Sequence, residues 1–184
     1  MSAAQAQTIS GAATIGINGC QVDGDTQSGY HKPGLKAGFS VSTPVDKTFG
    51  VESGLFFSSK GAIKRSQGYT EFKTKLNYAE LPIIVKYRFL PKIGVDATIS
   101  YNQQISSKII DDLGTETKNP DYLKKYDITA SIGLRFYLSL KYELTANFGY
   151  SLTKITDSPD MPYWRNNYIN LSLIRRFAGN NSQQ

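Results

Sequence analysis

The chain carries a single histidine, His31, which is the first residue to test as a catalytic group. A hydrolytic site would need its imidazole next to a carboxylate or a nucleophile. Asp23 and Asp25 are near in sequence, so a His–Asp pair is conceivable. No serine nucleophile motif lies near His31. We therefore predict that the protein has no catalytic residues and is not an enzyme.

A second group with possible chemistry is the acidic set Asp111, Asp112, Glu116 and Asp121. Carboxylates bind hard cations when a loop presents them at defined intervals, as in the EF-hand. The spacing of these four residues does not follow that pattern, and it is typical of a solvated loop. We predict no metal site and no cofactor.

Cys20 is the only cysteine, so no internal disulfide can form and the redox compartment stays open. A lipoprotein box over 17–20 is conceivable, but no basic segment or long apolar stretch precedes it, so a small strand-end residue is favoured. Residues 2–7 look like the end of a secretory signal, with Ala4-Gln5-Ala6 as the cleavage site. We expect 1–8 to be a signal remnant or a flexible N-terminus.

The strongest structural signal is alternation with a period of two residues. In 126–136 every second residue is apolar, and those between are Asp, Thr, Ser, Gly and Arg. In 140–151 the pattern repeats, with apolar residues at the even positions and Lys, Glu, Thr, Asn, Gly and Ser at the odd ones. This period is that of β-strands with one apolar face. Only a turn around Ser139 separates the two segments, which predicts a hairpin.

The same pattern predicts eight strands in one domain over 9–177, with 178–184 as a flexible tail. The expected strands are 12–20, 35–43, 49–59, 76–89, 93–104, 125–138, 140–151 and 168–177. The connections alternate between long and short: 21–34, 61–75, 105–124 and 152–167 are long, whereas 44–48, 90–92 and Ser139 are short. No run of about 18 apolar residues suggests a transmembrane helix. Outer-membrane barrels have short periplasmic turns and long extracellular loops. The sequence therefore predicts an all-β, eight-stranded antiparallel transmembrane barrel with up-and-down topology.

Aromatic residues on the apolar face concentrate at the strand ends. Near the short turns they are Phe49, Tyr87, Phe89, Phe136, Tyr142 and Phe177, and near the long loops they are Phe57, Tyr101, Tyr126, Phe148 and Tyr150. Aliphatic residues fill the middle. Two aromatic girdles around an aliphatic band are typical of a membrane-facing surface.

The opposite face is expected to point into a narrow lumen. By parity it carries five acids and five bases: Glu52, Glu80, Asp96, Asp127, Glu143, Lys86, Arg88, Arg135, Lys141 and Arg176. Buried charges are tolerated only when paired and hydrogen-bonded. An eight-stranded barrel is just wide enough for side chains to fill it. We predict a salt-bridged plug and no open pore.

The net charge of +6 must then reside outside the lumen. The second long loop and its flanks are basic, with Lys60, Lys64, Arg65, Lys73 and Lys75. We consider contact with phosphates of outer-leaflet glycolipid, because basic residues beside a membrane are attracted to anionic headgroups. A solvated loop is the alternative. Nucleic-acid binding is disfavoured because no RNA- or DNA-binding motif accompanies the charge.

The segment 77–89, NYAELPIIVKYRF, carries the family resemblance of this chain. With Tyr78, Glu80, Pro82, Lys86 and Tyr87 it resembles the Y-x-E-[IL]-P-x-x-x-K-Y strand of Bacteroidetes outer-membrane β-barrel proteins that include PorT-like members. Segments 34–39, 52–61, 127–134 and 166–177 resemble other strands of that family. The resemblance implies an outer-membrane barrel. PorT-like members are tied to type IX secretion and gliding, a role that a barrel motif alone does not transfer. Because Pro82 lacks a ladder donor, we expect it at a bulge or distorted position.

Two alternatives stay open from the sequence. A soluble lipocalin-like barrel shows the same alternation turned inside out, with the apolar face around a small hydrophobic ligand. The second alternative is a membrane barrel whose long loops bind a larger outer-membrane complex. It has the predicted fold and differs only in function. The girdles and the regular connections favour the membrane form.

Overall fold

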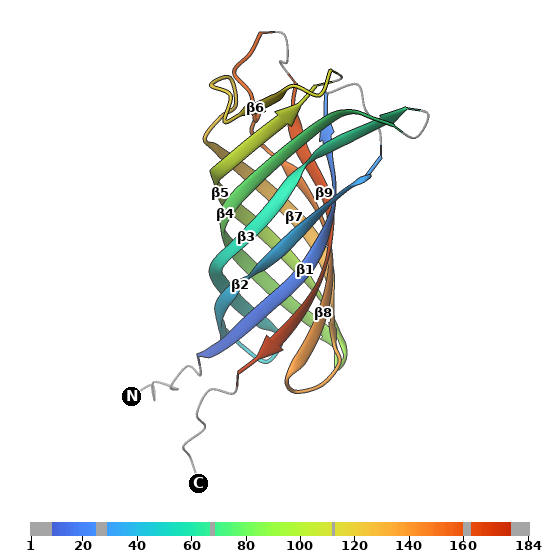
Figure 1. The fold of residues 1–184 in the computed structure, drawn as a ribbon. Coiled ribbons are helices and arrows are strands. Elements are labelled where there is room, and N and C mark those ends of the chain that lie inside the picture. Colours follow the sequence, from blue (N-terminus) through green and yellow to red (C-terminus); the bar gives the residue numbers. More distant parts are fainter. Residues whose placement is uncertain (1–8, 25–28, 67–68, 112, 160–162, 178–184) are drawn as a thin grey trace.

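The computed structural model describes residues 9–24, 29–66, 69–111, 113–159 and 163–177, and these form a tilted β-barrel (Figure 1). The predicted tails 1–8 and 178–184 lie outside the described residues. The strands are β1 (Ser10–Asp23), β2 (Lys32–Pro44), β3 (Phe49–Ser66), β4 (Tyr69–Leu90), β5 (Ile93–Ile110), β6 (Glu116–Lys118), β7 (Tyr126–Tyr137), β8 (Tyr142–Ser151) and β9 (Arg165–Arg176). In the part of the chain that is described, no helix is long and apolar enough to cross a membrane.

The sheet closes on itself. Its order is β4-β3-β2-β1-β9-β8-β7-β5-β6, and the additional pairing of β4 with β5 completes the ring. All of these pairings are antiparallel, and β9 lies beside β1 in a ladder from Ala12↔Arg176 to Asp23↔Arg165. The short strand β6 pairs only with β5, outside the ring. The predicted eight-stranded closed barrel is confirmed.

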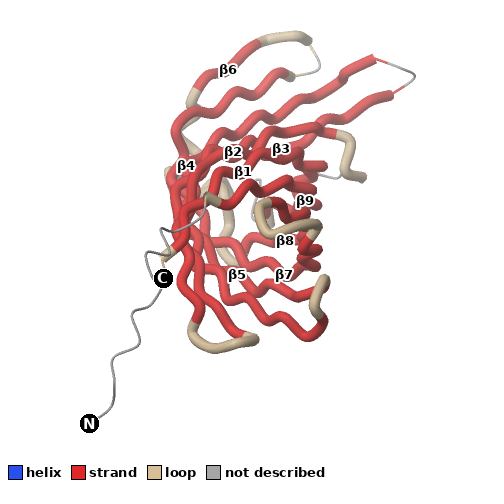
Figure 2. The backbone as a smooth tube through the Cα atoms, turned by 90° about the horizontal axis from the view of Figure 1, so that it is seen from below, coloured by secondary structure: helices blue, strands red, loops and turns tan. Residues whose placement is uncertain are grey.

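Short turns and long connections lie at opposite ends of the barrel. The turns 45–48, 91–92 and 138–141 lie at the end where β1 begins and β9 ends, at the bottom of Figure 1. The longer connections lie at the other end, and Figure 2 looks along the barrel from the short-turn end. We call these the short-turn end and the long-loop end.

One predicted loop is wrong. In its described residues, 61–66 and 69–75, the segment 61–75 is not a loop but the paired upper part of β3 and β4, with Ile63 opposite Lys73 and Ala62 opposite Thr74. Gly61 has a φ of 125°, and a Cβ on it would lie 2.1 Å from the carbonyl oxygen of Thr74. Glycine here permits a close strand contact inside the hairpin, whereas in the sequence it suggests a loop.

Other strand bounds also differ from the predicted ones. β5 runs on to Ile110 and carries β6, so the predicted loop 105–124 is partly strand. β1 and β9 are longer at the long-loop end, and β8 begins at Tyr142 because 138–141 forms the turn. In that turn the amides of Leu138 and Ser139 donate to the carbonyl oxygen of Tyr142.

The outward face is apolar. Exposed side chains on it include Ile15, Ile17, Phe39, Leu55, Ile83, Ile99, Ile132, Phe148, Leu171 and Leu173. Near the short turns Phe49 contacts Tyr87, with ring centroids 4.7 Å apart. Near the long loops Tyr101 stacks on Tyr126 at 6.2 Å. The lipocalin-like alternative is wrong, because the apolar residues of the central barrel face outward and the interior there is polar.

Arginine at the outer face should destabilise the folded protein only in the membrane band. Ile83 is 62% exposed in the middle of β4, and Leu113 is 87% exposed in a connection at the long-loop end. We expect Ile83→Arg to lower the free energy of unfolding by about 2–4 kcal/mol, the cost of a cation at mid-bilayer. Leu113→Arg, the matched control, should change it by less than about 0.5 kcal/mol. Urea unfolding in lipid vesicles measures both, and equal effects of the two variants would contradict a membrane-facing β4.

Candidate functional site: the barrel interior and its rims

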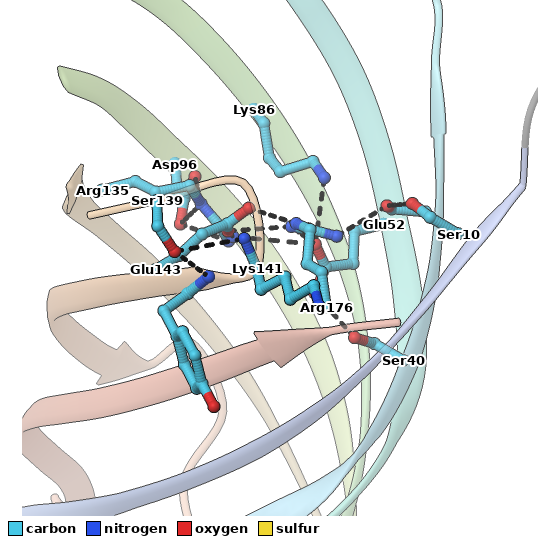
Figure 3. Close-up of polar contacts among 12 residues, drawn as sticks. Ser10, Ser40, Glu52, Lys86, Asp96, Arg135, Ser139, Lys141, Glu143 and Arg176 are labelled. Atoms are coloured by element: carbon cyan, nitrogen blue, oxygen red, sulfur yellow. Dashed lines mark hydrogen bonds and ion pairs between the residues drawn. The ribbon is translucent and has the colours of Figure 1, made fainter. Parts of the chain in front are cut away.

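The lumen near the short-turn end is organised around Arg135 of β7. The side chain of Arg135 is 2% exposed. Nε and Nη2 donate to the Asp96 carboxylate at 2.9 and 2.8 Å, and Nη1 donates to Glu143 (Figure 3). Asp96 is on β5 and Glu143 on β8, the strands on either side of β7. The guanidinium therefore bridges three adjacent strands.

Glu52 of β3 joins the far wall of the barrel to this group. Its Oε2 accepts hydrogen bonds from Lys86 Nζ and Arg176 Nη2, each at 3.0 Å, and its Oε1 accepts one from Ser40 at 2.8 Å. Arg176 also donates to Glu143 (Figure 3). Strands β3, β4, β8 and β9 thus share one hydrogen-bonded network.

We call these six residues the lower network: Glu52, Lys86, Asp96, Arg135, Glu143 and Arg176. Three carboxylates meet three cations, so the formal charge of the lower network is zero. Pairing and multiple hydrogen bonds are what make such a buried group tolerable, although replacing it by apolar residues need not destabilise the fold.

A second ionic group lies nearer the long-loop end. Glu80 accepts a hydrogen bond from Lys36 Nζ at 2.6 Å, and Lys60 Nζ lies 3.8 Å from the same carboxylate. Lys60 Nζ also lies 4.6 Å from the ring centroid of Tyr168 and 5.4 Å from that of Tyr78. Cation–π contacts of this kind stabilise a desolvated ammonium.

The expected position of Lys60 at the outer rim is wrong. Its side chain is fully buried in the lumen, where it also donates to Asn102 Oδ1 at 3.1 Å. The physical reason is the continuation of β3 past the predicted strand end, which keeps residue 60 on the inward parity. Lys36 is a lumen residue that the sequence analysis missed, although the same parity in β2 would have found it.

Asp127 is buried but has hydrogen-bonding partners of a different kind. Its carboxylate accepts from Ser151 Oγ at 2.7 Å, Asn166 Nδ2 at 2.9 Å and Thr153 Oγ1 at 3.1 Å. Neutral donors therefore satisfy Asp127, and none of the ion pairs found among the described residues includes it.

Arg88 and Lys141 lie outside the lower network. Both are exposed at the short-turn end. The guanidinium carbon of Arg88 lies 3.8 Å from the ring centroid of Tyr137. Strand parity places both residues on the inward face, but their positions at the strand ends place the side chains beyond the packed interior.

The family-like strand lies in β4 as parity requires. Tyr78 and Glu80 are buried and face the lumen with Pro82, whereas Tyr87 is exposed on the outer face. Pairing with β3 runs to Ser53↔Ile83 and resumes at Phe56↔Glu80 without a change of register. Pro82 therefore interrupts the ladder without a bulge. Ser53 Oγ donates to the Pro82 carbonyl oxygen at 2.8 Å, and the irregularities in β4–β5 pairing lie at Asn77/Tyr78 and Arg88/Leu90.

The interior changes character at the long-loop end, where a small apolar core lies above the charged lumen. The core consists of Val22, Ala62, Leu76, Tyr78, Ile109, Leu123, Ile155 and Trp164. Leu123, Ile155 and Trp164 come from the connections, and Ile155 accepts from the Lys124 amide at 2.9 Å. These connections therefore fold inward over the strands, which the sequence analysis did not anticipate.

An internal cavity of about 40 Å³ lies between the two ionic groups, with Glu52, Asp96 and Arg135 on one side and Lys36 and Tyr168 on the other. A buried water needs roughly 10–15 Å³ of such space and several polar partners. The cavity therefore suits a few water molecules, and it is too small for a lipid or a drug-sized ligand.

The catalytic and metal candidates are dispersed. His31 is exposed, Asp25 lies outside the described residues, and Asp23 accepts a hydrogen bond from Gln21 at 2.8 Å. Asp111 accepts from the amides of Leu113 and Thr115, and Glu116 pairs with Lys108. That contact lowers the pKa of Glu116. Among the described residues no three His, Cys, Asp or Glu side chains are placed to hold a metal ion.

Four lysines lie in a row on the outer face of strands β4, β5 and β6 at the long-loop end. Lys75 of β4, Lys108 of β5 and Lys118 of β6 are direct cross-strand partners, and Lys73 lies two residues from Lys75 on the same face. We call these four residues the outer lysine row. Lys73 and Lys75 were expected near a rim, whereas Lys108 and Lys118 were missed. The side chains of Lys64 and Arg65 lie outside the described residues.

Removing the central cation of the lower network should be costly. We expect Arg135→Met to lower the free energy of unfolding by about 3–5 kcal/mol, because Asp96 would stay buried without its cation and Glu143 would keep only Arg176. Arg135→Lys, which keeps the charge but loses the fork, should cost less. The control Arg175→Met alters an exposed arginine of β9 beside Phe177 and should cost under about 1 kcal/mol. Urea unfolding in detergent micelles measures all three variants. An Arg135→Met protein as stable as the wild type would show that the fold does not need the lower network.

Comparison with known proteins shows which family and which solved structures share this architecture. The protein family described as outer membrane protein beta-barrel domain matches residues 4–157. The curated proteins gave no match. Among solved structures, neisserial surface protein A is similar with a TM-score of 0.63 and 9% identity, covering 91% of this chain and 97% of that one. Ail, the attachment invasion locus protein of Yersinia pestis, has a TM-score of 0.58 and 13% identity, covering 92% and 99%.

These likenesses fit the closed barrel, its apolar outer face and its polar interior. The two solved structures share the fold at identities too low to carry function. The family match, however, spans most of the sequence. The chain belongs to the outer membrane protein beta-barrel domain family and is a protein of the outer membrane.

Proposed function

We propose that this protein is a non-enzymatic, non-conducting outer-membrane barrel that binds phosphate groups of outer-leaflet glycolipid through the outer lysine row. The observation that carries the proposal is the alignment of Lys75, Lys108 and Lys118 on three neighbouring strands. Like charges directly opposite one another destabilise a sheet. An anionic ligand that lies across the strands would remove that repulsion.

The charge balance of the row supports an external anion. Glu116 forms an ion pair with Lys108, and no other ion pair of the row is found among the described residues. Lys75 and Lys118 are exposed. Each lysine near an anionic lipid surface contributes about 1 kcal/mol to binding.

The position of the row also supports a lipid phosphate. In outer-membrane barrels the long loops are extracellular, so the long-loop end faces outward. On β4, Lys75 lies four residues beyond Ala79, which is opposite the girdle residue Phe57. The row thus lies just beyond the apolar band, at the height expected for headgroups.

The packed lumen supports the non-conducting part of the proposal. The lower network spans the barrel, the Lys36–Glu80–Lys60 group lies above it, and the apolar core covers both. In planar bilayers we expect the protein to show no steady conductance, because side chains fill the interior of a barrel of this size. A stable, reproducible single-channel current from the purified protein would overturn this part.

Within the family, the Tyr78–Tyr87 strand supports a PorT-like Bacteroidetes origin and an accessory role in a secretion or uptake complex. The connections at the long-loop end would contact the partner, since binding surfaces concentrate on such segments. The apolar core gives these connections a defined conformation.

The glycolipid proposal is tested by calorimetric titration of the micelle-embedded protein with phosphorylated and dephosphorylated outer-leaflet glycolipid. We expect K75Q/K108Q/K118Q to weaken binding of the phosphorylated form roughly a hundredfold, because three lysines at about 1 kcal/mol each contribute about 3 kcal/mol. The control K124Q/K125Q/K154Q removes three lysines from other connections at the same end and should change binding less than threefold.

Three outcomes would count against the glycolipid site: no binding by the wild type, equal loss in both triple variants, or equal affinity for the dephosphorylated form. Sucrose octasulfate serves as a competing anion, because Ail has been crystallised with this heparin analogue. Tighter binding of the sulfated sugar than of the glycolipid would make a sulfated glycan the better candidate ligand.

A further inference from the structure

A cavity of about 570 Å³ opens at the short-turn end, on the barrel axis below the lower network. Residues 46–48, 91–92 and 138–140 of the three short turns form its walls, and Lys86, Glu143 and Arg176 form its floor. We call this cavity the vestibule. Its volume is in the range of small-molecule binding sites. Because the short turns of outer-membrane barrels are periplasmic, the vestibule opens to the periplasm, at the end opposite the outer lysine row.

The lining of the vestibule has an excess of positive charge. Its cations are Lys47, Lys86, Arg88, Lys92 and Arg176, and its acids are Asp46 and Glu143. Glu143, Lys86 and Arg176 are already paired within the lower network.

The Asp46 carboxylate already accepts hydrogen bonds from its own turn. Its Oδ1 accepts from the amides of Thr48 and Phe49 at 2.6 and 2.7 Å, and these bonds lower its pKa. Lys47, Arg88 and Lys92 form no ion pair within the described part of the chain. These three cations therefore have no ion-pair partner among the described residues, and together with the Asp46 carboxylate they leave the vestibule with an excess of two positive charges.

Arg88 has the geometry of an anion anchor. Its guanidinium stacks on Tyr137 at 3.8 Å, and turn contacts hold both backbones: Arg88 N donates to Thr48 O at 2.8 Å, and Tyr137 N to Lys92 O at 2.9 Å. A stacked guanidinium keeps its N–H edge available for two parallel hydrogen bonds to an oxyanion.

The remaining lining indicates what the anion is attached to. Pro44, Pro91 and Leu138 add apolar surface beside the cations. We propose that the vestibule binds an organic anion with at least two negative charges on a phosphate or dicarboxylate group, with Arg88 as the bidentate anchor and Lys47 and Lys92 as supporting charges. This site is independent of the glycolipid proposal, because it lies at the other end of the barrel.

The test uses the full chain in uncharged detergent micelles, titrated calorimetrically with phenyl phosphate, phthalate and, as a neutral control, benzyl alcohol. We expect saturable binding of one or both anions, weakened at least tenfold by Arg88→Gln and less by Arg88→Lys. Lys141→Gln removes an exposed cation at the same end but outside the lining, and should change affinity less than twofold. The two anions distinguish phosphate from carboxylate as the preferred group.

Fold integrity is checked by the mobility shift between unboiled and boiled samples, which should be the same in all variants. The inference is overturned if neither anion binds saturably, if benzyl alcohol binds equally well, or if Arg88→Gln and Lys141→Gln weaken binding to the same extent.

Discussion

The structure depends on the requirement that every backbone polar group within a bilayer finds a partner inside the protein. The lipid core offers no hydrogen bonds, so a sheet that crosses it must close. Pairing of β4 with β5 and of β1 with β9 leaves no open strand edge in the barrel ring. Closure then assigns the two faces of each strand to different environments: lipid outside and a narrow lumen inside.

The narrow lumen explains the chemistry of the interior. Side chains of eight strands meet near one axis, and charged groups there must neutralise each other. Arg135 meets Asp96 and Glu143 from adjacent strands. Arg176 of β9 reaches Glu52 of β3 across the barrel, and Lys86 reaches Glu52 from the neighbouring strand β4. Cross-barrel contacts of this kind tie together strands that the backbone ladder does not pair directly.

The two ends of the barrel are chemically different, and the difference follows from their connections. At the long-loop end, the connections fold inward as an apolar core and leave the lysines on the outer surface. At the short-turn end the turns are too short to cover the axis, and the vestibule stays open below the lower network. The proposed lipid contact and the proposed anion site both follow from how the connections cover the barrel at one end and leave it open at the other.

Strand parity in the sequence determined the fold class, the eight-stranded meander and the apolar outer face. It also determined that residues such as Glu52, Asp96 and Arg135 face inward, because a period of two residues fixes which face each side chain occupies. Only the tertiary structure decided how far each strand extends and which charges meet. Lys60 turned out to be a lumen residue because β3 continues past Gly61, and Arg88 a rim residue because it lies at a strand end. The alignment of Lys75 with Lys108 and Lys118 depends on register between strands distant in sequence, and register follows from how the tilted strands close the ring, which no local pattern encodes.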